Sequence, residues 1–167
     1  MSADDIQKII RQESALVFSA FDEAAAFKIG SALRDRALTE NFPIIIDIRL
    51  WDRALFYCAL PGSTASNTDW ARRKINVVKM FQKSTYRMVL EQRPEKDIFP
   101  ARYGLNPSDY VLAGGGFPVR VEGAGVIGVI AVSGLPERQD HCIVVDAICD
   151  HLGLDRQEFA LSATAAK

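Results

Sequence analysis

The chain has 167 residues, a length that fits one domain with a single hydrophobic core. Apolar residues make up 49% of it and charged residues 25%, which is typical of a globular protein. The 20 basic residues are balanced by 21 acidic ones, so the formal net charge is −1. Such a balance produces no field that attracts nucleic acid or an anionic membrane, and we expect neither as a partner.

The first residues have neither the basic nor the apolar region of a secretory signal peptide. The longest nearly apolar run, residues 124–132, is too short to cross a bilayer. The three cysteines, Cys58, Cys142 and Cys149, are odd in number and lack Cys-x-x-Cys spacing. We therefore predict reduced thiols in a cytoplasmic protein that forms one domain over residues 1–167.

Along the first 41 residues, the pattern predicts two helices with a short strand between them. The first helix begins near Ser2, and the compact apolar run 15–18 is the predicted strand. Asp22 is a typical N-cap for the second helix. We expect that helix to end near Asn41, because Pro43 cannot continue it.

Residues 43–50 predict a strand, with Ile44, Ile46, Ile48 and Leu50 on one face and Ile45, Asp47 and Arg49 on the other. A turn at positions 51–52 leads into a second strand over 54–60, so the two form a hairpin. Asp47 and Arg49 share one face of the first strand. A structural ion pair between them is the favoured interpretation.

Ser66 and Asp69 have the spacing of a capping box for a third helix, which we expect to run to about Lys83. Residues 93–116 contain several prolines and predict a long loop with short helical turns. A second hairpin follows, with strands over 117–121 and 126–132.

Pro136 is placed to begin a long helix that Gly153 ends, and a short helix over 155–162 completes the chain. Two hairpins cannot belong to an all-parallel sheet. The predicted fold is therefore α+β: a five-stranded antiparallel sheet with helices packed on it, in a profilin-like α/β layer sandwich.

On the long helix after Pro136, His141 falls in the middle of the apolar stripe. We expect a neutral imidazole, because burial and the nearby helix N-terminus both disfavour the imidazolium ion. It is either a core histidine bonded to a carbonyl, or a histidine that contacts a ligand or acts as a general base. Neither histidine of the chain lies in a zinc-binding pattern, so no metal site is expected.

On the helix over 66–83, Trp70 and Lys74 fall on the apolar stripe. Lys74 either runs along the edge of the stripe with its charge in solvent, which is the commoner outcome, or reaches a pocket where it meets an anionic group. Residues 114–116 are consecutive glycines without the ending of a phosphate-binding loop. They predict backbone freedom or close approach of a ligand.

Several motifs in order resemble a family of uncharacterised proteins related to the haem-degrading domain proteins of the HbpS and GlcG type. The resemblance runs from about Phe18 to Gly153. The motifs are Leu60-Pro-Gly-Ser-Thr, Asn67-Thr-Asp-Trp-Ala-Arg-Arg-Lys74, Gly115-Gly-Phe-Pro-Val-Arg120, and Val132-Ser-Gly-Leu-Pro136 with Asp140-His141.

The resemblance implies a profilin-like fold, a homo-oligomer and, in some relatives, haem binding with slow degradation. Three functions follow as hypotheses. The leading one is an oligomeric small-ligand-binding protein with haem or a related tetrapyrrole as ligand; the others are a non-enzymatic assembly or partner-binding module and a haem-degrading oxidative enzyme. By residue type only His141 suits the haem iron. The predicted ligand-binding residues are Trp70, Lys74, Phe117, Arg120 and His141.

Overall fold

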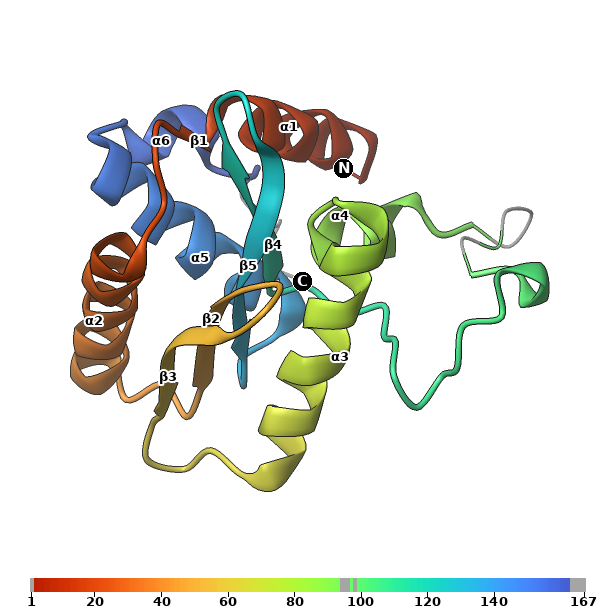
Figure 1. Cartoon of the computed structure of the whole chain (residues 1–167), viewed down its shortest axis with the longest axis horizontal. Coiled ribbons are helices and arrows are strands. Elements are labelled where there is room, and N and C mark those ends of the chain that lie inside the picture. The colour runs from red at the N-terminus through yellow and green to blue at the C-terminus, as the bar shows by residue number, and fades with distance from the viewer. Residues whose placement is uncertain (1, 94–96, 98, 163–167) are drawn as a thin grey trace.

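A computed structural model describes residues 2–93, 97 and 99–162 of the chain (Figure 1). The elements in chain order are α1 (Ser2–Ala15), β1 (Val17–Phe18), α2 (Glu23–Glu40), β2 (Ile45–Leu50), β3 (Ala54–Ala59), α3 (Ala65–Phe81), α4 (Thr85–Glu91), the 3-10 turn η1 (Ala101–Tyr103), β4 (Gly116–Val121), β5 (Gly125–Ser133), α5 (Glu137–Leu152) and α6 (Arg156–Phe159).

The five strands form one sheet in the order β1-β4-β5-β2-β3. Both predicted hairpins are present, and β2 also pairs antiparallel with β5. The expectation of a purely antiparallel sheet is wrong, because β1 lies parallel to β4, with Val17 opposite Arg120 and Phe18 opposite Val121. A tight turn forces neighbouring strands to be antiparallel, whereas β1 reaches β4 only after most of the chain has intervened. The sheet is therefore mixed, within the expected α+β class.

Helices cover both faces of the sheet: α2 and α5 pack on one, and α3 packs on the other (Figure 1). The alternation in β2 works as predicted, since Ile44, Ile46 and Ile48 enter the main core between the sheet and α2 with α5. On the opposite face of β2, Arg49 donates two hydrogen bonds to the Asp47 carboxylate, at 2.7 and 3.0 Å. The predicted ion pair is confirmed.

Several element boundaries differ from those expected. Thr64 and Asn67 form the capping box of α3 instead of Ser66 and Asp69, and the helix ends where Gln82 adopts a left-handed conformation. The first strand is shorter than predicted because Ala15 completes the last turn of α1.

At the C-terminal end, α6 spans only Arg156–Phe159, capped by the Asp155 carboxylate. Between α3 and the long loop, α4 was missed altogether: at 7 residues it is too short to show helical periodicity.

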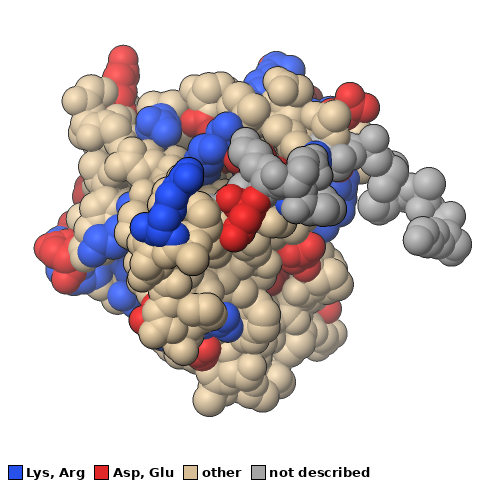
Figure 2. Space-filling view, turned by 90° about the vertical axis from the view of Figure 1, so that its right-hand side faces the viewer, with Lys and Arg blue, Asp and Glu red and all other residues tan. Residues whose placement is uncertain are grey.

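The described segment of residues 99–115 lies away from the sheet and leads back to it at β4 (Figure 1). As predicted, it is mostly loop, with one turn of 3-10 helix at Ala101–Tyr103. The side of the molecule that carries this segment shows acidic and basic side chains interspersed among uncharged ones (Figure 2).

Candidate functional site

A buried ion pair joins α3 to α5 at one end of the sheet. The Lys74 ammonium donates to the Asp140 carboxylate at 3.0 Å and to the carbonyl oxygen of Val132 at 2.9 Å. The two residues are only 2% and 1% exposed. Lys74 therefore does not run along the helix edge into solvent, which was the commoner of the two outcomes considered.

The Asp140 carboxylate is also held by the backbone of the turn that precedes α5. It accepts from the amide of Leu135 at 3.0 Å and from that of Gly134 at 3.4 Å. Charge-assisted bonds of this kind stabilise a carboxylate and fix its orientation. The carboxylate is therefore held from both sides, by the ammonium of Lys74 and by two backbone amides.

The consecutive glycines before and within β4 make room for this ion pair. Gly115 has φ +126°, and a Cβ there would overlap the carbonyl oxygen of Val132 and lie 2.8 Å from the Lys74 Nζ. At Gly114 a Cβ would overlap the carbonyl oxygen of Glu137. The close approach that these glycines allow is thus to the chain itself, around Lys74 and the N-terminus of α5.

A cavity of about 260 Å³ opens beside the ion pair. Trp70 is 38% exposed at this cavity, and Glu137 lies at the first turn of α5. The cavity is lined by Asn67, Trp70, Lys74, Ala113, Ser133, Gly134, Leu135, Glu137 and Asp140. We call this the Lys74 cavity.

Burial sets the electrostatics of the cavity wall. It lowers the pKa of Lys74 and raises the pKa of Asp140, because each charged form loses its hydration, while attraction between the two charges opposes both shifts. An ammonium group has three N–H donors, and among the described residues two acceptors are present for it. One donor of Lys74 is therefore free for an acceptor atom in the cavity.

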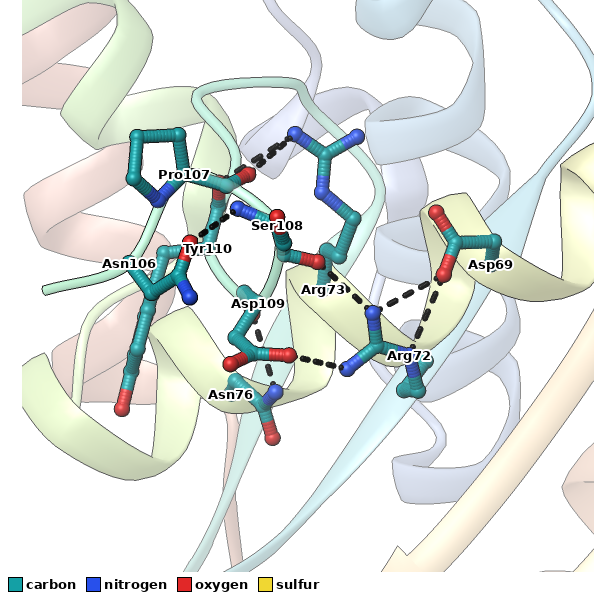
Figure 3. Close-up of polar contacts among 9 residues, drawn as sticks. All are labelled: Asp69, Arg72, Arg73, Asn76, Asn106, Pro107, Ser108, Asp109 and Tyr110. Atoms are coloured by element: carbon teal, nitrogen blue, oxygen red, sulfur yellow. Dashed lines mark hydrogen bonds and ion pairs between the residues drawn. The ribbon is translucent and has the colours of Figure 1, made fainter.

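The loop before β4 contributes Ala113 to the lining of the cavity and is tied to α3 by two arginines (Figure 3). Arg72 bonds to the Asp109 carboxylate at 2.8 Å and to the carbonyl oxygen of Ser108 at 2.7 Å. Arg73 donates to the carbonyl oxygen of Pro107 at 2.8 Å, and its guanidinium lies 5.1 Å from the centre of the Trp70 ring. The loop, Arg73 and the Trp70 ring thus pack together beside the cavity.

His141 lies one residue after Asp140 and points the other way, into the core. It is fully buried, and its Nε2 is 2.8 Å from the side-chain oxygen of Gln12. Since the Gln12 amide nitrogen donates to Phe159, its oxygen must accept, and the proton of His141 resides on Nε2. Burial lowers the pKa of His141 to about 3, with the Arg138 charge adding to the effect. The imidazole is neutral, as expected.

The other two predicted site residues lie elsewhere. Phe117 is 1% exposed in the main core, with its ring 5.9 Å from that of His141. Arg120 lies on β4 opposite Val17, near the far end of that strand. The structure thus brings Trp70 and Lys74 together at the cavity, places Phe117 and His141 together in the core, and leaves Arg120 apart from both.

Sequence reasoning missed Asp140, Ser133 and Asn67 as site residues. A carboxylate in the first turn of a helix is sufficiently explained by the helix dipole, so Asp140 gave no separate signal. The available signal was Lys74 itself, since a lysine on an apolar stripe that is buried needs an anionic partner. Choosing that partner required knowing that α3 and α5 meet at the end of β5.

Other kinds of site would need clustered metal ligands, a long apolar helix or reactive thiols. Within residues 2–93, 97 and 99–162, no group of three or more His, Cys, Asp or Glu residues stands close enough to hold a metal ion. The described helices include none that is long and apolar enough to span a membrane. Cys58, Cys142 and Cys149 are all free, as predicted, and burial raises the pKa of Cys149 to about 11.

Known proteins resemble this chain in sequence and in fold. The UPF0303 protein of Mesorhizobium japonicum is 69% identical over 163 residues, which cover 98% of both chains. Among solved structures, the Ybr137w protein matches with a TM-score of 0.78 at 22% identity, over 89% of this chain and 87% of that one. The PduOC–heme complex matches with a TM-score of 0.67 at 20% identity, over 78% of this chain and 94% of that one. At such identities, these structures establish the fold alone.

A family model described as haem degrading protein, HbpS-like, matches residues 21–149, which include every strand from β2 to β5, α2, α3 and most of α5. The chain belongs to the HbpS-like family, together with its UPF0303 relatives.

Proposed function

We propose that this protein binds a small ligand that carries a carboxylate, and that the ligand occupies the Lys74 cavity. One observation carries the proposal: a buried ammonium group lines a cavity and retains a donor that the described residues leave unused. A charge-assisted bond from such a donor to a carboxylate is strong because water is excluded. The half-exposed Trp70 ring offers a flat apolar surface beside it.

Haem is the ligand that the family name and the PduOC–heme neighbour suggest. Neither the Lys74 cavity nor His141 fits it as a coordination site. The lining of the Lys74 cavity contains none of the usual iron ligands His, Cys, Met or Tyr, and His141 is enclosed in the core with its Nε2 bonded to Gln12. Moreover, about 260 Å³ lies below the range of about 300–1,000 Å³ that is usual for ligand sites. Within a single chain, the Lys74 cavity is therefore large enough for the propionate-bearing edge of a tetrapyrrole but not for the whole ring.

A haemin titration followed by the Soret band tests the tetrapyrrole hypothesis. The proposal predicts that Lys74→Met weakens binding at least about tenfold, since a buried charge-assisted bond contributes about 1.5–3 kcal/mol. The exposed Lys79 on the same helix supplies the matched control, Lys79→Met, which should bind as the wild type does. His141→Ala should also leave the Soret shift in place.

Three results would count against parts of this account. If the wild type shows no saturable Soret shift, haem is excluded as the ligand and smaller carboxylates remain. If the Soret shift is lost in His141→Ala, His141 takes part in haem binding after all. Equal binding by Lys74→Met and the wild type would exclude the Lys74 cavity as the tetrapyrrole site.

A homo-oligomer is the second part of the proposal. It is supported by large apolar side chains at the surface of α2 and β3, where Phe27 is 64% exposed and Tyr57 49% exposed. Such side chains are the usual anchors of subunit interfaces. Light scattering on the purified protein should give a multiple of 18.4 kDa. A monomer at micromolar concentration would contradict this part and leave the ligand site unaffected. If the protein is an oligomer but binds no ligand saturably, that result favours the alternative function, a non-enzymatic assembly module.

A further inference from the structure

Lys74 and Asp140 can exchange one proton without any exchange with solvent. Nζ lies 3.0 Å from Oδ2, both residues are almost fully buried, and the contact is direct. Transfer of the proton across it converts two buried charges into a neutral amine and a neutral carboxylic acid. Because isolated buried charges are costly, the neutral pair is much closer in free energy here than it would be in water. A nucleophilic amine is thus within reach at the wall of the cavity.

We propose that Lys74 is a nucleophile and forms an imine with a small carbonyl compound that also carries a carboxylate, as 2-oxo acids do. This inference rests on the ligand site proposed above and names its substrate class. A buried lysine of this kind is the usual precursor of such imines, because desolvation increases the fraction of neutral amine. Burial lowers the pKa of Lys74 in the folded protein.

The surroundings of Lys74 suit a compound of a few carbon atoms. About 260 Å³ is available, and the side chains of Asn67 and Ser133 provide polar atoms in the lining. The N-terminus of the 16-residue helix α5 borders the same cavity, and this end of a helix favours an anionic group. A carboxylate next to the carbonyl carbon would then lie beside the charge that the iminium ion retains.

The reaction needs no oxidant or reductant. Asp140 first accepts a proton from the Lys74 ammonium, and the amine lone pair forms a bond to the carbonyl carbon while the carbon–oxygen π bond opens. Proton transfer from nitrogen to oxygen gives the carbinolamine. The protonated Asp140 then returns its proton to the hydroxyl, which leaves as water. An ammonium ion and a carbonyl compound thus yield an iminium ion and one water, with the carboxylate regenerated.

Reductive trapping tests the proposal. The full chain is incubated at neutral pH with pyruvate and sodium cyanoborohydride, and the reduced adduct is located by intact mass and peptide mapping. We expect Lys74 to be modified several-fold faster than the exposed Lys79, because burial lowers the pKa of Lys74 and so leaves more of it as the neutral, nucleophilic amine. In Lys79→Met the fast adduct should persist. Lys74→Met should lose it.

The wild-type peptide map alone decides the question, so a variant that fails to fold does not affect the test. Adducts spread over the lysines without preference for Lys74 would overturn the imine proposal. Lactate, which lacks the carbonyl group, separates the two claims: if lactate and pyruvate both bind near Trp70 but no adduct forms at Lys74, the nucleophile is wrong and the carboxylate site stands. If neither binds, both proposals fail for this class of ligand.

Discussion

At the scale of single residues, His141 is a base that the fold keeps neutral. Its pKa falls from 6.5 to about 3 on burial. As the pH is lowered, the unfolded chain therefore takes up this proton before the folded chain does. The free energy of unfolding should be unaffected by His141 above about pH 6.5 and should fall below it. From this one group the loss is up to about 1.4 kcal/mol per pH unit until about pH 3.

Urea unfolding at a series of pH values measures this effect. The variant His141→Gln removes the titrating group, so its stability should decline less steeply than that of the wild type between pH 6 and about pH 4. The other histidine, His151, is exposed, although partial burial lowers its pKa too, so His151→Gln serves as the comparison for a histidine outside the core. Parallel curves for wild type and His141→Gln would show that His141 titrates normally in the folded state.

The ion pair between Lys74 and Asp140 should matter more for stability than any exposed pair. Lys74→Met leaves the Asp140 carboxylate buried without its cation, which typically costs about 3–5 kcal/mol. The double variant with Asp140→Asn removes that charge and should recover part of the loss. In a double-mutant cycle by urea unfolding, we expect a coupling of at least about 1 kcal/mol.

The exposed pair of Arg34 and Asp35 provides the comparison for this cycle. Its disruption should change the stability by less than about 1 kcal/mol. Strictly additive losses for Lys74 and Asp140 would mean that the two side chains do not interact in solution.

At the scale of elements, the glycines before β4 have a steric role in addition to the backbone conformation that they allow. Gly115 and Gly123 both have positive φ, but a Cβ at Gly123 would meet no atom within 4 Å. Gly123→Ala should therefore cost only the conformational penalty of about 1–2 kcal/mol. Gly115→Ala should cost distinctly more, because its φ of +126° is less tolerable for alanine and because the new Cβ also displaces Val132 and Lys74. Thermal unfolding of the two variants gives the comparison, and equal losses would contradict the crowding around Lys74.

Elements with strong local signals were predictable. Asp22 caps α2 as expected, Asn41 and Gly153 end their helices in left-handed conformations, and both hairpins are in place. These features depend on a few neighbouring residues. Strand β1 is only 2 residues long, and its parallel pairing depends on β4, about 100 residues later in the chain. No local pattern carries that information.

At the scale of the whole molecule, the candidate site depends on contacts between distant elements. Lys74 and Asp140 are 66 residues apart, and the Gly114–Gly116 segment meets them from a third place in the chain. The sequence singles out Lys74 and Trp70 by their position on an apolar stripe. The sequence also shows that Asp140 and His141 are one step of about 100° apart around α5. It does not show that the direction of His141 leads into the core and that of Asp140 to the cavity.

The central claim is that the ligand binds beside Trp70, and the two tryptophans of the chain test it directly. Trp51 lies at the other end of β5, where its indole N–H donates to the carbonyl oxygen of Val126 at 3.2 Å. The two indole N–H resonances of ¹⁵N-labelled protein, assigned with Trp51→Phe, can be followed during titration with pyruvate and with protoporphyrin IX. We predict a saturable shift of the Trp70 resonance with at least one of them, an unchanged Trp51 resonance, and no shift in Lys74→Met. Saturable binding that leaves Trp70 unperturbed would place the ligand elsewhere and contradict the account.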